Sequence, residues 1–104
     1  MKILHLTLKK KWFDMIASGE KKEEYREMKD HWDSRLRNKD GSLKVFDYVR
    51  FSHAYSKGRS TMLVVWESCE IKCGKKEWGA ELNKLYYTTS LGEIVELNRK
   101  IISK

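Results

Sequence analysis

The sequence predicts one α+β domain whose strands pair mostly in the antiparallel sense. At 104 residues the chain has the length of a single domain, and aromatic residues make up 12% of it, too many for a disordered chain. The expected elements follow the order β-α-β-α-β-β-β-α, and consecutive strands joined by a short loop indicate antiparallel pairing. Because strands and helices do not alternate regularly, a doubly wound parallel sheet is not expected.

A strand and a helix open the chain. Residues 2–8 alternate between apolar and other side chains, which predicts a strand. Its core-facing residues are Leu4, Leu6 and Leu8. Residues 10–18 have apolar side chains at helical spacing, and Gly19 is a typical stop signal. The spacing of Trp12 and Phe13 favours a place in the core over a platform on which bases stack.

A strand, a short helix and a turn follow. Residues 20–28 are predicted to form the strand, although their composition also tolerates a helix. Residues 30–37 are predicted to form a short helix with Asp30 as its N-cap. Residues 38–42 read Asn-Lys-Asp-Gly-Ser, which is typical of a turn.

The second half of the chain is predicted to be rich in strands. Residues 44–52 alternate as a strand does, and a loop over 56–60 joins them to the long β-rich run 61–72. A polar loop over 74–83 precedes a strand over 84–89. A closing helix is expected over residues 92–103. Its apolar stripe consists of Ile94, Val95, Leu97 and Ile101.

The composition favours a cytoplasmic protein with a polyanionic partner. The net charge is +7, and residues 29–59 hold the largest share, with eight basic residues against four acidic ones. We expect no membrane span, because no apolar run is long enough, and no signal peptide at the N-terminus. Cys69 and Cys73 are expected to be reduced thiols, and we expect neither a metal site nor a cofactor.

The most informative segment runs from Gly19 to Arg26. It sets Gly19, Lys21, Glu24 and Arg26 at G-x-K-x-x-E-x-R spacing, directly after the predicted helix. This motif and the order of elements around it resemble the ASCH domain family of the PUA-like superfamily, over essentially the whole chain. The resemblance implies a single ASCH domain over residues 1–104, a small PUA-like β-barrel of mostly antiparallel strands flanked by helices, with a cleft lined by the motif. It also implies RNA or a nucleotide-like ligand as the partner.

Some small ASCH domains are amidohydrolases that deacylate a modified cytidine, and other members have been linked to ribonuclease activity. In the deacylating members a threonine stands at the place of Glu24 and works with a lysine at the place of Lys21. The sequence therefore lacks that nucleophile, which favours recognition over catalysis. An enzyme would use Lys21 and Glu24 as its catalytic residues.

The chemistry of the motif suits a ligand site. Lys21 offers a compact cation, Arg26 a planar fork for phosphate or a base edge, and Glu24 an acceptor or general base. On a regular strand Glu24 and Arg26 share a face and Lys21 does not, so the site requires Lys21 to lie on the turn after Gly19. The alternative is that all three are solvated strand charges.

Further binding residues are expected outside the motif. Lys9 and Lys10 belong to a basic run at a helix start, where phosphate contact and plain solvation are both open. One predicted hairpin interleaves cations with aromatic rings, in a pattern that suits single-stranded nucleic acid: Arg50, His53, Tyr55, Lys57 and Arg59. The alternative is an ordinary exposed hairpin.

Two other aromatic residues have open roles. Tyr25 either stacks on a base or packs as an ordinary strand tyrosine. Trp78 is either a lid or, as its loop favours, a plug for the barrel end. A domain that binds RNA is thus the leading hypothesis, with an enzyme and a protein-interaction module as alternatives.

Overall fold

A computed structural model shows a small α+β fold, described here for residues 1–55 and 58–98. The elements in chain order are β1 (Ile3–Thr7), α1 (Lys10–Ala17), β2 (Glu23–Glu27), α2 (Asp30–Leu36), β3 (Tyr48–Tyr55), β4 (Gly58–Cys73), the 3-10 turn η1 (Lys76–Trp78) and β5 (Leu85–Asn98). No helix in the described part of the chain is long and apolar enough to cross a membrane.

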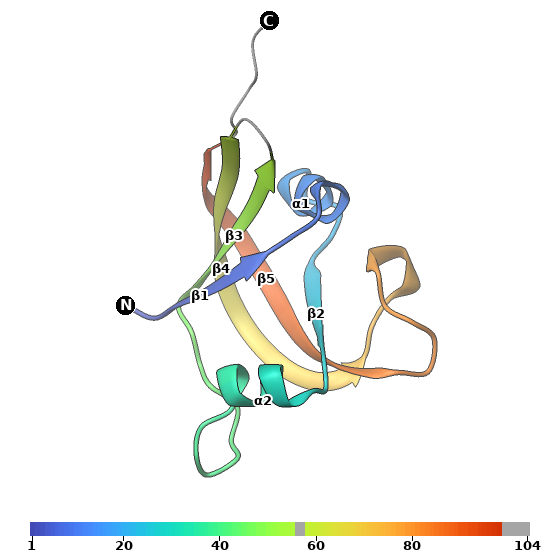
Figure 1. The fold of residues 1–104 in the computed structure, drawn as a ribbon. Helices are drawn as coiled ribbons and strands as arrows, with labels where there is room; N and C mark the ends of the chain where they lie inside the picture. The colour runs from blue at the N-terminus through green and yellow to red at the C-terminus, as the bar shows by residue number, and fades with distance from the viewer. Residues whose placement is uncertain (56–57, 99–104) are drawn as a thin grey trace, which may run out of the picture.

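The strands form one five-stranded sheet in the order β1-β3-β4-β5-β2. The pair β1–β3 is parallel, and the other three pairs are antiparallel, as expected for the fold class. The sheet curls into a half-barrel, with α1 near one end and α2 near the other (Figure 1). The curl brings the edge strands β1 and β2 toward each other across the open side (Figure 1).

The core fills the inside of this curl. As predicted, Leu4 and Leu6 of β1 and Leu8 directly after it are buried, and α1 adds Phe13 and Ile16. The central strands contribute the best-buried side chains, which are Val49, Phe51, Met62, Val64 and Tyr87. The sequence prediction for the first two elements is therefore confirmed, because short-range alternation and helical spacing suffice to find one buried face.

The predicted closing helix is wrong for residues 92–98. These residues continue β5, which pairs with β4 through Leu97 opposite Met62 and Ile94 opposite Val64. The register shifts near Trp66 let the two long strands bend together. Pairing along β4 thus overrides a stripe of apolar residues that also fits a helix. The rest of the predicted helix, residues 99–103, lies outside the described residues.

Several predicted boundaries also differ. The strand predicted over 44–52 begins only at Tyr48, because the preceding segment runs as a loop beside the start of β1, with the Asp47 N–H donating to the Lys2 carbonyl. Asp30 is the first residue of α2 and not its N-cap; Lys29 holds that position without a side-chain cap. Part of the predicted loop 56–60 belongs to β4, and residues 56–57 lie outside the described residues.

The α2 helix is tied to the sheet by a buried hydroxyl. Tyr87 on β5 is fully buried, and its hydroxyl donates to the Asp33 carboxylate. The Nε of Arg37, directly after the helix, donates to the same hydroxyl at 2.8 Å. Burial raises the pKa of Tyr87, and the hydrogen bond to Asp33 raises it further.

Candidate functional site

The candidate site begins where α1 ends. Gly19 has a φ of +86°, a left-handed conformation that glycine adopts without strain, and its N–H donates to Ile16 at 3.0 Å. The Lys21 N–H then returns to the Met15 carbonyl at 3.0 Å. Lys21 therefore lies on the turn between α1 and β2, as the motif requires, and its side chain points inward with 2% of its surface exposed.

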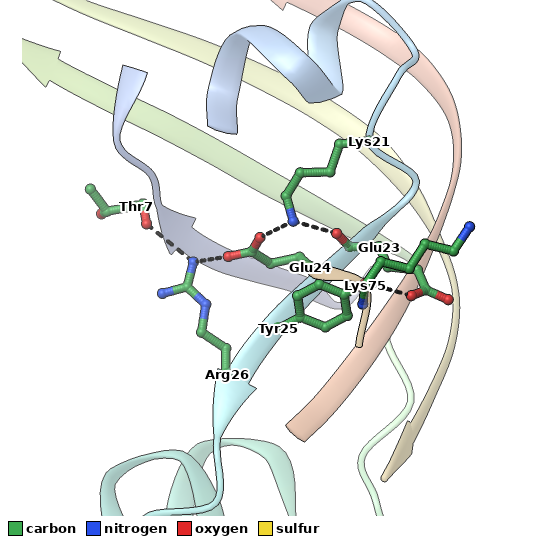
Figure 2. Close-up of polar contacts among 7 residues, drawn as sticks. All are labelled: Thr7, Lys21, Glu23, Glu24, Tyr25, Arg26 and Lys75. Atoms are coloured by element: carbon green, nitrogen blue, oxygen red, sulfur yellow. Dashed lines mark hydrogen bonds and ion pairs between the residues drawn. The ribbon is translucent and has the colours of Figure 1, made fainter. Parts of the chain in front are cut away.

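The three charged residues of the motif form one continuous network (Figure 2). The Lys21 ammonium lies 2.9 Å from one carboxylate oxygen of Glu24, and Arg26 donates to the other at 2.6 Å. Lys21 also donates to the Glu23 carbonyl. Because Lys21 and Glu24 are buried, the alternative in which all three are solvated strand charges is wrong.

Arg26 extends this network to the opposite edge of the sheet. Its guanidinium donates to the Thr7 carbonyl at the end of β1, at 3.1 Å (Figure 2). It also stacks on the Trp32 ring of α2, 4.9 Å from the centroid. Its Nε is buried without a hydrogen-bond partner among the described residues. The motif therefore both closes the open side of the half-barrel and lines its interior.

Burial sets the electrostatics of the network. Desolvation lowers the pKa of Lys21, and attraction to Glu24 opposes the shift. The neighbouring Arg26 cation adds to the lowering. A buried ammonium with a lowered pKa is one that can release its proton more readily than a surface lysine.

A pocket of about 320 Å³ opens directly over this network. Of the three charged motif residues expected to line the cleft, only Glu24 does; Lys21 and Arg26 contact Glu24 but are not part of the lining. Four aromatic rings line it, those of Trp12, Tyr25, Trp78 and Tyr86. The other carboxylates in the lining belong to Glu27 and Glu81. Its size is at the small end of ligand pockets, which fits a single ring system better than a folded segment of chain.

Tyr25 is a fixed wall of this pocket. Its hydroxyl donates to Glu23 at 2.7 Å and accepts from the Lys75 N–H at 2.9 Å. Gly74 allows this approach, because a Cβ there would lie 2.5 Å from the Tyr25 ring. Both interpretations of Tyr25 from the sequence therefore remain compatible with the structure: the ring is packed, and it also lines the pocket.

Two further rings of the pocket wall come from elements outside β2 and β5: Trp12 from α1 and Trp78 from η1. Trp78 is held on η1, and Gly79 behind it has a φ of +104°. A Cβ on Gly79 would lie 3.0 Å from the Trp12 ring, so the two segments are in close contact. Trp12 also belongs to the rim of the core, as its spacing indicated. A second cavity of about 680 Å³ shares Trp78 with this pocket, and its charged lining residues are Lys22, Lys75, Glu23, Glu67 and Glu93.

The other predicted binding residues lie elsewhere. Lys9 and Lys10 are exposed at the start of α1, and Lys10 pairs with Asp14 at 2.7 Å. Arg50 on β3 is half-buried and lies 3.4 Å from Glu96, while Arg59 is exposed near the start of β4. None of these four lines either of the two cavities. The structure does not describe the side chain of Tyr55. Lys57, which belongs to the same predicted hairpin, lies outside the described residues.

Three residues of the pocket were not found from the sequence: Glu27, Glu81 and Tyr86. Glu27 follows Glu24 at a spacing that carries no chemical signal, and the other two lie more than fifty residues away along the chain. The antiparallel pairing of β2 with β5 sets Tyr86 opposite Glu27, and Lys84, just before β5, joins Glu81 to Glu27 by ion pairs. A pocket assembled across strands leaves no local pattern in the sequence.

Within the described residues, no cluster of His, Cys, Asp and Glu is arranged to hold a metal ion, and Cys69 and Cys73 are free. Comparison of the chain with protein-family models, with curated proteins and with solved structures finds no match. The fold and the site are therefore defined by the geometry above.

Proposed function

We propose that this chain is an ASCH domain of the PUA-like superfamily that binds RNA or a nucleotide in the cytoplasm, with a base held in the pocket over Lys21, Glu24 and Arg26. The observation that carries the proposal is the buried ion-pair network beside an aromatic pocket, built by the G-x-K-x-x-E-x-R motif. Aromatic rings stack on bases of any sequence, and a buried carboxylate accepts from base N–H groups.

The surroundings of the pocket suit the sugar-phosphate part of such a ligand. Lys75 is exposed, lies over the Trp78 ring at 4.4 Å, and also lines the second cavity. Lys22 is exposed in the same second cavity. Because Glu23, Glu67 and Glu93 also line the second cavity, Lys75 at the shared edge is the cation that a phosphate of the bound strand meets, while the base enters between the rings.

Fluorescence anisotropy with a short labelled single-stranded RNA tests this proposal. We expect binding that weakens steeply with added salt, and an affinity about tenfold lower in Trp78→Leu, since one stacking contact contributes about 1–3 kcal/mol. Phe46→Leu is the matched control, because Phe46 packs against Trp66 and lines neither cavity. RNA binding that is equal in Trp78→Leu and the wild type would refute the proposed site.

A specific observation also favours an enzyme as the second candidate. Glu24 lines the pocket and is held by the buried Lys21 ammonium at 2.9 Å, which places a carboxylate in position to act as a general base on a bound substrate. Incubation with acylated cytidines and with RNA should then give product that is lost in Glu24→Gln. Retained RNA binding without turnover would leave the binding module as the function.

A further inference from the structure

The charged groups that line the pocket are all carboxylates, which only accept hydrogen bonds when they are ionised. Its charged lining residues are Glu24, Glu27 and Glu81, and no lysine or arginine lines it within the described part of the chain. The two tyrosine hydroxyls are engaged by backbone N–H groups, that of Lys75 for Tyr25 and that of Glu81 for Tyr86. Three carboxylates without a cation in the described lining favour a ligand with positive charge, and they repel a phosphate from the interior of the pocket.

The rings of the pocket already hold cations. Lysine ammonium groups lie over them at 5.6 Å for Lys21 on Trp12, 4.8 Å for Lys21 on Tyr25 and 5.4 Å for Lys84 on Tyr86. The electron-rich ring faces and the carboxylates thus act together on positive charge. Aromatic ring faces together with carboxylates are also the groups that bind cationic ligands in other proteins.

Lys84 is the group that a ligand cation would replace. Its ammonium contacts Glu27 at 2.6 Å and Glu81 at 3.2 Å, so it holds both of the outer carboxylates of the pocket. Its side chain is only about one-third exposed and lies against the Tyr86 ring. The Lys84 ammonium therefore lies where Glu27, Glu81 and the Tyr86 ring together attract a cation.

We propose that the pocket selects a positively charged nucleobase, one carrying a methyl group on a ring nitrogen, over its neutral counterpart. The inference rests on the proposed function and names the chemical class of its ligand. The charged ring lies among the four aromatic side chains, and its N–H groups donate to the carboxylates. The phosphate of the nucleotide remains outside, beside Lys75.

Isothermal titration calorimetry with 7-methylguanosine monophosphate and guanosine monophosphate tests the inference. We expect the methylated nucleotide to bind about tenfold more tightly, because the ring faces and the carboxylates attract a charged base and not its neutral counterpart. Glu27→Gln should reduce that ratio, since it removes a carboxylate. Lys84→Met should raise it, since it removes the competing ammonium. Glu70→Gln, an exposed carboxylate outside both cavities, should leave the ratio unchanged.

The outcomes separate this inference from the function on which it rests. Equal affinity for the two nucleotides would overturn the preference for a charged base and leave nucleotide binding standing. If single-stranded RNA binds in the anisotropy experiment but neither mononucleotide binds, the inference alone fails. If neither RNA nor nucleotide binds, both fail. A ratio that rises in Glu27→Gln or falls in Lys84→Met would also overturn it, because the signs follow directly from the charges.

Discussion

At the scale of single residues, Lys21 and Glu24 show how a motif becomes a site. A charged pair withdrawn from water is expensive unless each charge has partners, and here two cations share one carboxylate. Strand alternation alone separates Lys21 from the other two residues, and only the turn after Gly19 reunites them. The sequence indicated that geometry through the position of the glycine, but it did not reveal that the group is buried.

Replacement of Lys21 by Met should destabilise the fold strongly. It leaves Glu24 buried with one cation in place of two, and we expect a loss of about 3 kcal/mol in the free energy of unfolding. Urea denaturation followed by circular dichroism measures the change.

The matched control is Lys10→Met. It removes the Lys10–Asp14 pair, which has a similar distance of 2.7 Å but an exposed lysine. An exposed pair contributes less than about 1 kcal/mol, so the two variants should differ clearly. Similar losses in both would show that the burial of Lys21 has no energetic consequence.

At the scale of elements, β5 and α2 differ in what their sequences reveal. The short α2 was predicted almost in full, whereas the end of β5 was expected to be a helix. The apolar residues of 92–98 fit both the helical period and the alternation of a strand. They form a strand because they pair with β4. Likewise, the attachment of α2 through Tyr87 depends on a residue more than fifty positions away from Asp33.

Tyr87→Phe should loosen α2 from the sheet. The variant leaves the Asp33 carboxylate and the Arg37 Nε without their shared partner, and we expect a loss of about 1–3 kcal/mol in the free energy of unfolding at neutral pH.

This loss should shrink in alkaline solution. The pKa of Tyr87 is raised in the folded chain, so the unfolded chain releases the proton first, near pH ~10. The stability that the hydroxyl provides is complete below that pH and decreases above it. Urea denaturation of both proteins at neutral pH and above pH ~10 checks this. A difference between them that does not change with pH would contradict it.

At the scale of the whole molecule, the open side of the half-barrel is the decisive feature. The edge strands β1 and β2 are not paired with each other, and arginines occupy the gap between them. Arg26 reaches the Thr7 carbonyl of β1, and Arg35 on α2 reaches the His5 carbonyl at 3.3 Å. Side chains thus satisfy edge carbonyls that would otherwise face solvent or another chain.

Arg26→Leu should open this edge without unfolding the sheet. We expect backbone amides of β1 and β2 to exchange with deuterium at least about tenfold faster, since hydrogen bonds to charged groups contribute about 1.5–3 kcal/mol each. Hydrogen–deuterium exchange with mass spectrometry measures the rates.

Arg50→Leu serves as the control, because it breaks only a surface contact to Glu96. Its β1 and β2 amides should exchange as in the wild type. Faster exchange confined to α2 in Arg26→Leu would show that Arg26 supports the helix through Trp32 and does not close the sheet.

The local pattern of residues was sufficient for the fold class, for the buried faces of β1 and α1, and for the turn that carries Lys21. These features depend on neighbours a few positions apart, where alternation and helical spacing act. The extended end of β5, the closure by Arg26 and the pocket walls from Glu27, Glu81 and Tyr86 depend on strand pairing between distant segments. They arise only once the sheet has curled, because it is the curl that brings those side chains face to face.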